Sequence, residues 1–276
     1  MSAEPIHTGG DGFADAQTFA FADREAGFFG LARAGVSGGQ GSALGVLFAG
    51  REPVSVVAEG GAEVGADATW DALALPGLSV RTLEPHRRWA VTLQADPGFE
   101  LEFEAVSPPG ELYELGGMEG HEKLCRVRGT VAGRPIDCLG QRGRSWGTAD
   151  WSRIDLTRSV GAWLEEGPSL VFAAVRPSGA ESHADEAHWA ALLDGEGAVE
   201  ISDPRISTTY DGDGHQRRAG LELWVSEEDG YPRRGAGQVL CGSSVELGQL
   251  RLDCAFFAWT LDGREGVGRY DVLRRA

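Results

Sequence analysis

The stretch GFELEFEAV, residues 98–106, decides the fold class because its side chains change character at every position. Phe99, Leu101 and Phe103 are apolar, and each is followed by a glutamate. Successive side chains of a β-strand point to opposite faces of a sheet, so one face of this segment is apolar and the other is charged. The pattern is typical of an antiparallel sheet that covers a core on one side and meets water on the other.

Similar alternation appears on both sides of this stretch, in RRWAVTLQ (87–94) and in AGLELWVSEEDG (219–230). Turn signals separate such segments. VRGTVAGRPIDCLG (127–140) predicts a hairpin that turns at Ala132-Gly133, and Asp-Gly pairs begin at positions 194, 213, 229 and 262. DATWDALALPGL (67–78) allows at most one helical turn before Pro76. The sequence therefore predicts an all-β protein built as antiparallel sandwiches or barrels.

The chain is long enough for two such units. Its 276 residues include 41 glycines, which are spread along the chain as turns are in an all-β protein. The Pro108-Pro109 break precedes the strand-like HEKLCRVRGTV, residues 121–131. We therefore predict two β domains in tandem, residues 1–115 and 116–276.

Composition restricts the partners. With 42 acidic against 25 basic residues the net charge is −17, so we expect no nucleic-acid partner. No apolar run reaches the roughly 18 residues of a membrane span, which predicts no integral membrane segment. The N-terminus lacks a signal-peptide layout, so we expect a soluble, cytoplasmic protein. Its four cysteines are then expected to be thiols, and no CxxC motif suggests a zinc or redox site.

The stretch LGQRGRSWGTADW, residues 139–151, fits neither an ordinary strand nor a helix. Arg142 and Arg144 carry fixed charge, while Trp146 and Trp151 offer flat apolar surface with one N–H each. Two interpretations stay open at this point. The stretch is a structural corner, whose arginines cap carbonyl groups and whose tryptophans plug a barrel end, or it lines a functional site.

The pattern GQRxxSWGxxDW in this stretch resembles the signature of the hydroxyneurosporene synthase (carotenoid 1,2-hydratase) and AttH-like family. The matching residues are Gly140, Arg142, Ser145, Trp146 and Gly147, with Asp150 and Trp151 following. Residues 23–36, 121–131 and 262–271 are also similar to family segments. The resemblance implies two lipocalin-like β-barrel halves. Proteins of this architecture include carotenoid hydratases, fungal Diels–Alderases of the decalin type and proteins of no known activity.

This chain departs from the family at one place. Gly143-Arg144 stands where the family commonly has Asp-His, and imidazole is the usual proton shuttle near neutral pH. Either the inherited activity is lost or another acid acts, and Glu122, Asp137 and Asp150 are the nearby candidates. A carboxyl group walled in by tryptophan has a raised pKa and can protonate an alkene or an epoxide. The alternative for each acid is an ion pair with a neighbouring arginine.

Other motifs predict little chemistry. The six histidines have no metal-ligand spacing, so we expect no metal site, and nothing predicts a cofactor. Ser145 lies in no nucleophile elbow. His188 opens a predicted strand, where it either lines a barrel mouth or is simply a partly exposed strand residue.

These observations predict a cofactor-independent enzyme of secondary metabolism that acts on a hydrophobic polyene, terpenoid or polyketide. The reaction would be a cyclisation, isomerisation or hydration, by acid catalysis and cation stabilisation in an aromatic cavity. The predicted catalytic residues are Glu122, Arg142 and Asp150, and the predicted substrate-binding residues are Trp146, Trp151, Trp163, His188 and Trp259. The alternative is a lipocalin-like carrier that only binds such a molecule. Either protein would be a monomer or a homodimer.

Overall fold

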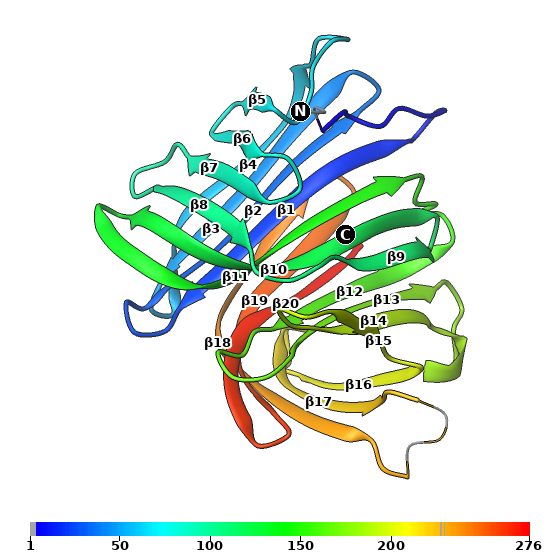
Figure 1. Ribbon diagram of the computed structural model, residues 1–276. Helices are drawn as coiled ribbons and strands as arrows, with labels where there is room; N and C mark the ends of the chain where they lie inside the picture. Colours follow the sequence, from blue (N-terminus) through cyan, green and yellow to red (C-terminus); the bar gives the residue numbers. More distant parts are fainter. Residues whose placement is uncertain (1–3, 227, 229) are drawn as a thin grey trace. The chain divides into compact units, whose positions relative to one another are not determined.

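The computed structural model describes residues 4–226, 228 and 230–276. Within these residues the chain contains antiparallel β-strands and one short 3-10 turn at His183–Asp185, and no α-helix (Figure 1). The chain divides into two compact units. Unit 1 is Met1–Val106 with Gly117–Ala149, and unit 2 is Ser107–Gly116 with Asp150–Ala276. The predicted all-β class with two antiparallel halves is confirmed.

Unit 1 is one curled sheet. Its strands are β1 (Ala14–Asp23), β2 (Phe28–Ser37), β3 (Gln40–Ala49), β4 (Glu52–Glu63), β5 (Ala72–Leu75), β6 (Leu78–Glu84), β7 (Arg88–Leu93), β8 (Phe99–Ala105), β10 (Met118–Val131) and β11 (Arg134–Gly147). They follow the order β4-β3-β2-β1-β11-β10-β8-β7-β6-β5. The sheet closes on itself across a core: a Cβ added to Gly45 in β3 would lie 2.2 Å from Leu93 in β7.

Unit 2 repeats this architecture. Its strands are β9 (Gly110–Leu115), β12 (Ile154–Ala162), β13 (Ser169–Pro177), β14 (Ala187–Leu193), β15 (Ala198–Glu200), β16 (Asp203–Tyr210), β17 (Gln216–Trp224), β18 (Arg233–Leu247), β19 (Leu250–Leu261) and β20 (Arg264–Arg275). The sheet order is β15-β14-β13-β12-β20-β19-β18-β17-β16. Gly110 in β9 packs against Trp189 and Leu193 of β14.

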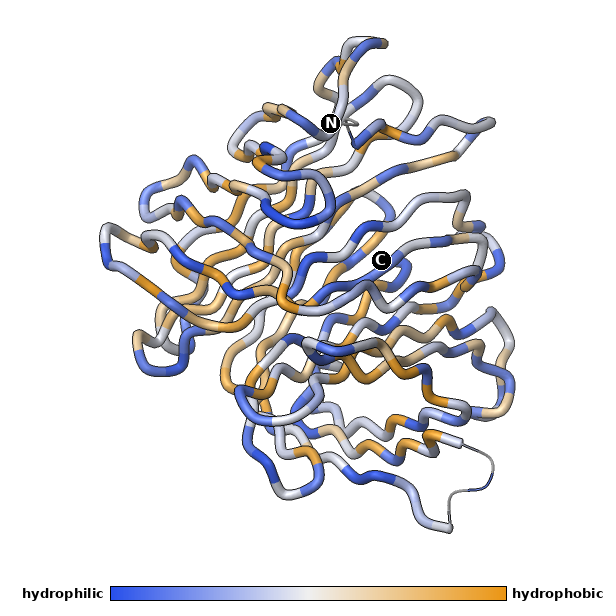
Figure 2. The backbone as a smooth tube through the Cα atoms, in the orientation of Figure 1, coloured by the Kyte–Doolittle hydropathy of each residue, from blue (hydrophilic) through white to orange (hydrophobic). Residues whose placement is uncertain are grey.

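The alternating segments form the strands that the sequence predicts. In β8 the side chains of Phe99, Leu101 and Phe103 are buried, and Phe103 lies opposite Val127 of β10. These residues belong to the apolar core of unit 1, and the hydropathy changes along the strands in Figure 2. Because one side of each strand is buried and the other meets water, apolar and polar residues alternate along the sequence.

The turns also follow the local sequence. Ala132 (φ 49°) and Gly133 (φ 74°) join β10 to β11, and Asp262 (φ 50°) with the following glycine joins β19 to β20. Both residues of such a tight turn need positive φ, which explains the small or turn-forming side chains. The turn predicted at 229 includes Asp229, which lies outside the described residues. The helical turn considered for residues 67–78 is wrong: β5 forms there, because Leu73 and Leu75 alternate into the core.

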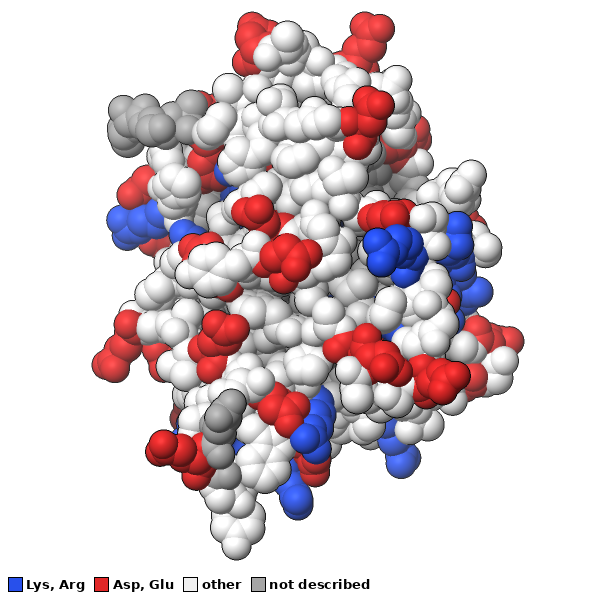
Figure 3. Space-filling model, turned by 90° about the vertical axis from the view of Figure 1, so that its right-hand side faces the viewer, with Lys and Arg blue, Asp and Glu red and all other residues white. Residues whose placement is uncertain are grey.

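The compact units assign the hairpin β10–β11 to unit 1, because β11 pairs with β1 along its length. The predicted domains, 1–115 and 116–276, place that hairpin in the second half. That a boundary at residue 115 separates independently folding pieces stays a prediction. No helix among the described residues is long and apolar enough to cross a bilayer. Acidic side chains outnumber basic ones on the face drawn in Figure 3, as the net charge leads one to expect.

Candidate functional site

The arginine- and tryptophan-rich stretch lies on β11 of unit 1, where Arg142 is fully buried. Its Nη2 donates to Glu4 Oε2 over 2.8 Å, its Nη1 lies 2.6 Å from His121 Nε2, and its guanidinium sits 4.5 Å from the centre of the Trp89 ring. The Glu4 carboxylate also accepts the backbone N–H of His86, at 2.7 Å. The buried charges of Arg142 and Glu4 therefore compensate each other inside unit 1.

Arg144 forms a second pair of the same kind. Its Nη2 donates to Asp15 Oδ2 over 2.8 Å, and its guanidinium lies 5.6 Å from the centre of the Trp146 ring. Asp15 is fully buried and also accepts the His7 backbone N–H at 2.7 Å and the Trp70 indole N–H at 3.2 Å. Residues 4–15 thus supply both carboxylates that neutralise the arginines of β11. Arg142 thus binds a carboxylate and an imidazole, and not the carbonyl groups that the structural interpretation gave it as partners.

The pKa values in this network are displaced in directions that disfavour proton transfer. Burial, together with the charges of Arg142 and Lys123, lowers the pKa of His121 to about 2, so the imidazole is neutral at ordinary pH. Burial opposes ionisation of Glu4, but Arg142 and the His86 N–H outweigh it and lower the pKa of this carboxyl. Neither group is a proton donor near neutral pH.

The predicted catalytic acids each have polar partners of their own. Glu122 is on the opposite face of β10 from His121, and its Oε2 accepts Gln141 Nε2 at 2.7 Å. Asp150 is an exposed residue of unit 2 whose carboxylate accepts the backbone N–H of Ser152 at 3.0 Å, and the bonds with Ser152 lower its pKa. Asp137 pairs with Arg126 and Arg128 of β10, which is the ion-pair alternative considered for it.

The predicted aromatic residues are divided between the units. Trp146 of unit 1 packs edge-on against His7, with ring centres 4.6 Å apart. Trp151, Trp163 and Trp259 belong to unit 2. Trp163 and Trp259 are buried, and Trp259 stacks on Phe257 at 5.4 Å. None of these four tryptophans is among the residues that line the unit 2 cavity described next.

A cavity of about 760 Å³ lies in unit 2. Its apolar wall comes from Phe172 and Ala174 of β13, Ile206 of β16 and Leu221 of β17. The residues that add polar groups are His183, Glu186 and His188, together with the ion-paired Asp203, Arg205, Glu222 and Arg234. His188 was predicted from sequence to contact substrate, and it lines this cavity. The size and the apolar lining with a few polar groups suit a drug-sized apolar molecule.

Glu186 is the buried acid of this cavity. Its Oε2 accepts Arg158 Nη1 at 2.5 Å, and its Oε1 lies 3.5 Å from His183 Nδ1 and 3.8 Å from Arg176 Nη1. The Glu186 and Arg158 side chains are each 5% exposed, whereas His183 is 70% exposed. A buried carboxylate therefore lies beside a solvent-exposed imidazole at the edge of an apolar cavity.

Arg158 is held in place by hydroxyl groups. Tyr210 is hydrogen-bonded to Arg158 and to Tyr270, and the Tyr270 hydroxyl lies 2.5 Å from Thr208 Oγ1. Burial opposes the charge on Arg158, but Tyr270, Tyr210 and Glu186 outweigh it and raise its pKa. Arg158 consequently stays charged, and its position is fixed from β16 and β20.

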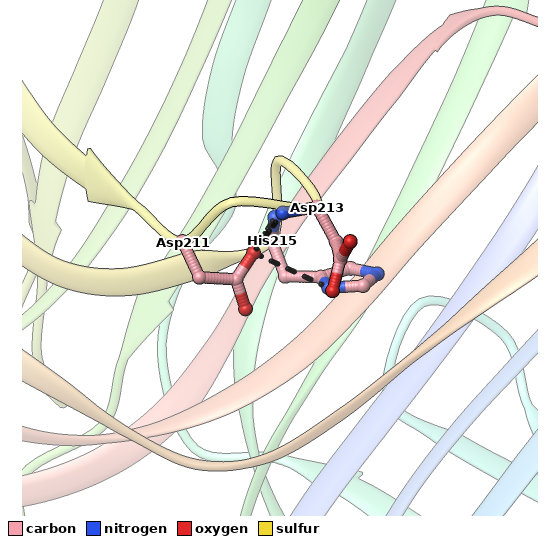
Figure 4. Close-up of side chains that lie close together, drawn as sticks. All are labelled: Asp211, Asp213 and His215. Carbon is pink, nitrogen blue, oxygen red and sulfur yellow. Dashed lines mark hydrogen bonds and ion pairs between the residues drawn. The ribbon is translucent and has the colours of Figure 1, made fainter.

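One group of side chains in unit 2 has the residue types of a metal site. Ligand atoms of Asp211, Asp213 and His215 lie within 4.8 Å of one another (Figure 4). Asp211, however, accepts the backbone N–H groups of Asp213 and His215 through Oδ1, and Arg217 binds its Oδ2 at 2.7 Å. These bonds lower the pKa of Asp211 to about 2. The group is a turn stabilised by an aspartate, which accounts for its geometry.

The four cysteines are free, buried thiols. Burial raises the pKa of Cys125, Cys138 and Cys241 to about 12 and raises that of Cys254 as well. Thiols in such surroundings are poor nucleophiles, so they act as core residues.

The fold and the cavity define an all-β protein with two lipocalin-like halves, the second of which is hollow. The chain belongs to the family described as "Domain of unknown function (DUF7064)", whose profile matches residues 3–276. Comparison with the curated proteins finds no match.

Two solved structures are similar to this chain. Kievitone hydratase from Nectria haematococca shares 9% sequence identity with a TM-score of 0.67, over 96% of this chain and 89% of that one. The protein named CghA shares 12% identity with a TM-score of 0.53, over 96% and 88%. At such identities the likeness concerns the fold. These folds confirm the two lipocalin-like halves that the resemblance implies.

Proposed function

We propose that the chain is a cofactor-independent enzyme that acts on a hydrophobic small molecule in the cavity of unit 2. The observation that carries the proposal is the junction of an apolar wall with the His183–Glu186 pair, whose nitrogen and oxygen are 3.5 Å apart. Imidazole is the usual proton shuttle near neutral pH. The cavity therefore supplies the group that the chain lacks at Gly143-Arg144.

The reaction that fits this arrangement begins with proton transfer to a carbon–carbon double bond. The imidazolium of His183 gives a proton to one carbon and leaves a cation on its neighbour. The Glu186 carboxylate stabilises the positive charge on either group. In a hydration, water adds to the cation and returns a proton to His183. In a cyclisation, a second double bond of the substrate adds instead, and the cation that results loses a proton to His183.

Hydration is the first reaction to test, because a protein with this fold is named a hydratase. A polyene, terpenoid or polyketide substrate would match the apolar wall formed by Phe172, Ile206 and Leu221. The catalytic roles predicted for Glu122, Arg142 and Asp150 stay predictions.

A carrier without catalysis is the second candidate. It is favoured by the positions of Glu122, which is bonded to Gln141, and of Asp150, which is exposed and bonded to Ser152. On this view, the cavity only holds the hydrophobic molecule.

The test is to incubate the purified protein with a panel of polyenes, terpenoids and polyketides and to follow the products by liquid chromatography and mass spectrometry. The enzyme hypothesis predicts a hydrated or isomeric product with the wild-type protein and none with His183→Ala. A compound that co-purifies with the protein and is never altered would support the carrier. If no compound binds or reacts, both hypotheses are wrong.

A further inference from the structure

The buried ion pair beside the unit 2 cavity has unused hydrogen-bonding capacity on both partners. The bond from Arg158 Nη1 to Glu186 Oε2 engages one atom of each side chain. Across the part of the chain that the structure describes, Arg158 Nε and Glu186 Oε1 have no hydrogen-bond partner. Both side chains are 5% exposed, so bulk water does not readily complete these bonds.

The nearest basic side chains do not complete them either. His183 Nδ1 and Arg176 Nη1 lie 3.5 Å and 3.8 Å from Glu186 Oε1, which is longer than an ordinary charge-assisted hydrogen bond. Buried polar groups of folded proteins are nearly always paired, and an exception calls for an explanation. Because Glu186 lines the cavity, a bound molecule can supply the missing partner.

The hydrogen-bonding character of the two unpartnered atoms indicates which polar group the ligand carries. Arg158 Nε–H is a donor and Glu186 Oε1 is an acceptor, and the two belong to one bonded pair. A carboxylate would meet the like charge of Glu186, and an ammonium would meet that of Arg158. A ketone accepts only and leaves Oε1 without a donor. A hydroxyl group donates and accepts at once, so of these four groups it is the one that complements both a donor and an acceptor.

We propose that the ligand of this cavity carries a hydroxyl group, as an alcohol, a phenol or an enol, and that Arg158 and Glu186 bind this group while Phe172, Ile206 and Leu221 cover the apolar remainder. The proposal rests on the proposed function, because it requires that the cavity binds a small molecule. The contacts of Arg158 with Tyr210 fix the guanidinium in advance, so the site discriminates without rearranging.

Four probes of one shape test the proposal: naphthalene, 2-naphthol, 2-naphthoate and 2-naphthylamine, each titrated into the full chain by calorimetry. We expect 2-naphthol to bind about 10- to 100-fold more tightly than naphthalene, since it makes hydrogen bonds to charged groups. The naphthoate and the amine should bind more weakly than 2-naphthol. Equal binding of naphthalene and 2-naphthol, or tightest binding of the naphthoate or the amine, would overturn the proposal.

The variant Glu186→Gln tests whether Glu186 causes the preference for 2-naphthol over naphthalene. The amide has the size of the acid, and its carbonyl can still accept from Arg158, but its NH₂ group then stands where Oε1 accepted. The preference for 2-naphthol should fall to less than about threefold, with naphthalene binding unchanged. A preference that persists in this variant would overturn the assignment to Glu186.

Ala174→Leu, which fills the cavity, should weaken all four probes alike. If no probe binds the wild-type chain, the proposed function fails together with this inference. If all bind equally and Ala174→Leu weakens them, the cavity stands and only the hydroxyl assignment fails. If Glu186→Gln does not fold, the order of the four probes on the wild-type chain decides by itself.

Discussion

The two units share one architecture and use buried charge in different ways. In unit 1, Arg142 and Arg144 each meet a carboxylate from residues 4–15, and the strands pack closely across the core. In unit 2, Arg158 and Glu186 form one ion pair beside a cavity of about 760 Å³. Among the described residues, Arg142 Nε in unit 1 lacks a hydrogen-bond partner just as Arg158 Nε does, but Glu186, whose Oε1 has no partner, lines the cavity. The difference indicates that the Arg142–Glu4 pair supports the fold of unit 1, whereas the Arg158–Glu186 pair of unit 2 is available to a ligand.

Breaking the ion pair of unit 1 should have the largest effect. Arg142→Met leaves the buried Glu4 carboxylate with only the longer, 3.9 Å contact to Arg144, and we expect a loss of about 3–5 kcal/mol in the free energy of unfolding. Urea denaturation measures this loss. Arg128→Met is the control, because Arg128 pairs with Asp137 at the surface and should contribute no more than about 1 kcal/mol. Equal losses in the two variants would show that the Arg142 network does not stabilise unit 1.

The next largest effect should be the pH dependence of the unfolding free energy that His121 of unit 1 causes. The pKa of His121 is about 2 in the folded chain and roughly 6.5 when unfolded, so the unfolded state binds the proton first as pH falls. The contribution of neutral His121 to the free energy of unfolding is therefore fully present above about pH 6.5. It is lost toward lower pH, by roughly 1.4 kcal/mol per pH unit. The slope of unfolding free energy between about pH 6.5 and 4.5 should be shallower in His121→Gln. An unchanged slope would contradict the neutral, buried imidazole.

Added volume should distinguish the two interiors. A Cβ on Gly45 would lie 2.2 Å from Leu93 inside unit 1, so Gly45→Ala should destabilise the chain by about 1–3 kcal/mol. Ala174 lines the unit 2 cavity, where Ala174→Leu finds room and should cost less than about 1 kcal/mol. Both values come from thermal or urea unfolding. A larger loss for Ala174→Leu than for Gly45→Ala would mean that the cavity is not open space.

The sequence allowed the fold to be predicted where local pattern and tertiary burial agree. The alternation of Phe99, Leu101 and Phe103 and the Ala132-Gly133 turn are local signals, and the structure follows them. β5 was missed because its four residues are too few to show a period before the turn at Pro76.

The candidate site was only partly predictable. Arg158 interrupts the apolar alternation of Leu156, Val160 and Ala162, which is a visible signal of a buried charge. Its partner Glu186 lies 28 positions away, and no local pattern connects the two. The carboxylate of Glu4 was missed for the same reason, since the pair that it forms with Arg142 spans 138 positions.

The central claim is that unit 2, and not the Arg142–Trp146 corner of unit 1, binds the hydrophobic ligand. The most direct measurement is the affinity of 2-naphthol for the wild-type chain, for Ala174→Leu and for Trp146→Phe, by calorimetry under one set of conditions. We predict that Ala174→Leu weakens binding by about tenfold or more, while Trp146→Phe binds as the wild type does. Weakened binding in Trp146→Phe, with full affinity in Ala174→Leu, would contradict the account and return the ligand to unit 1.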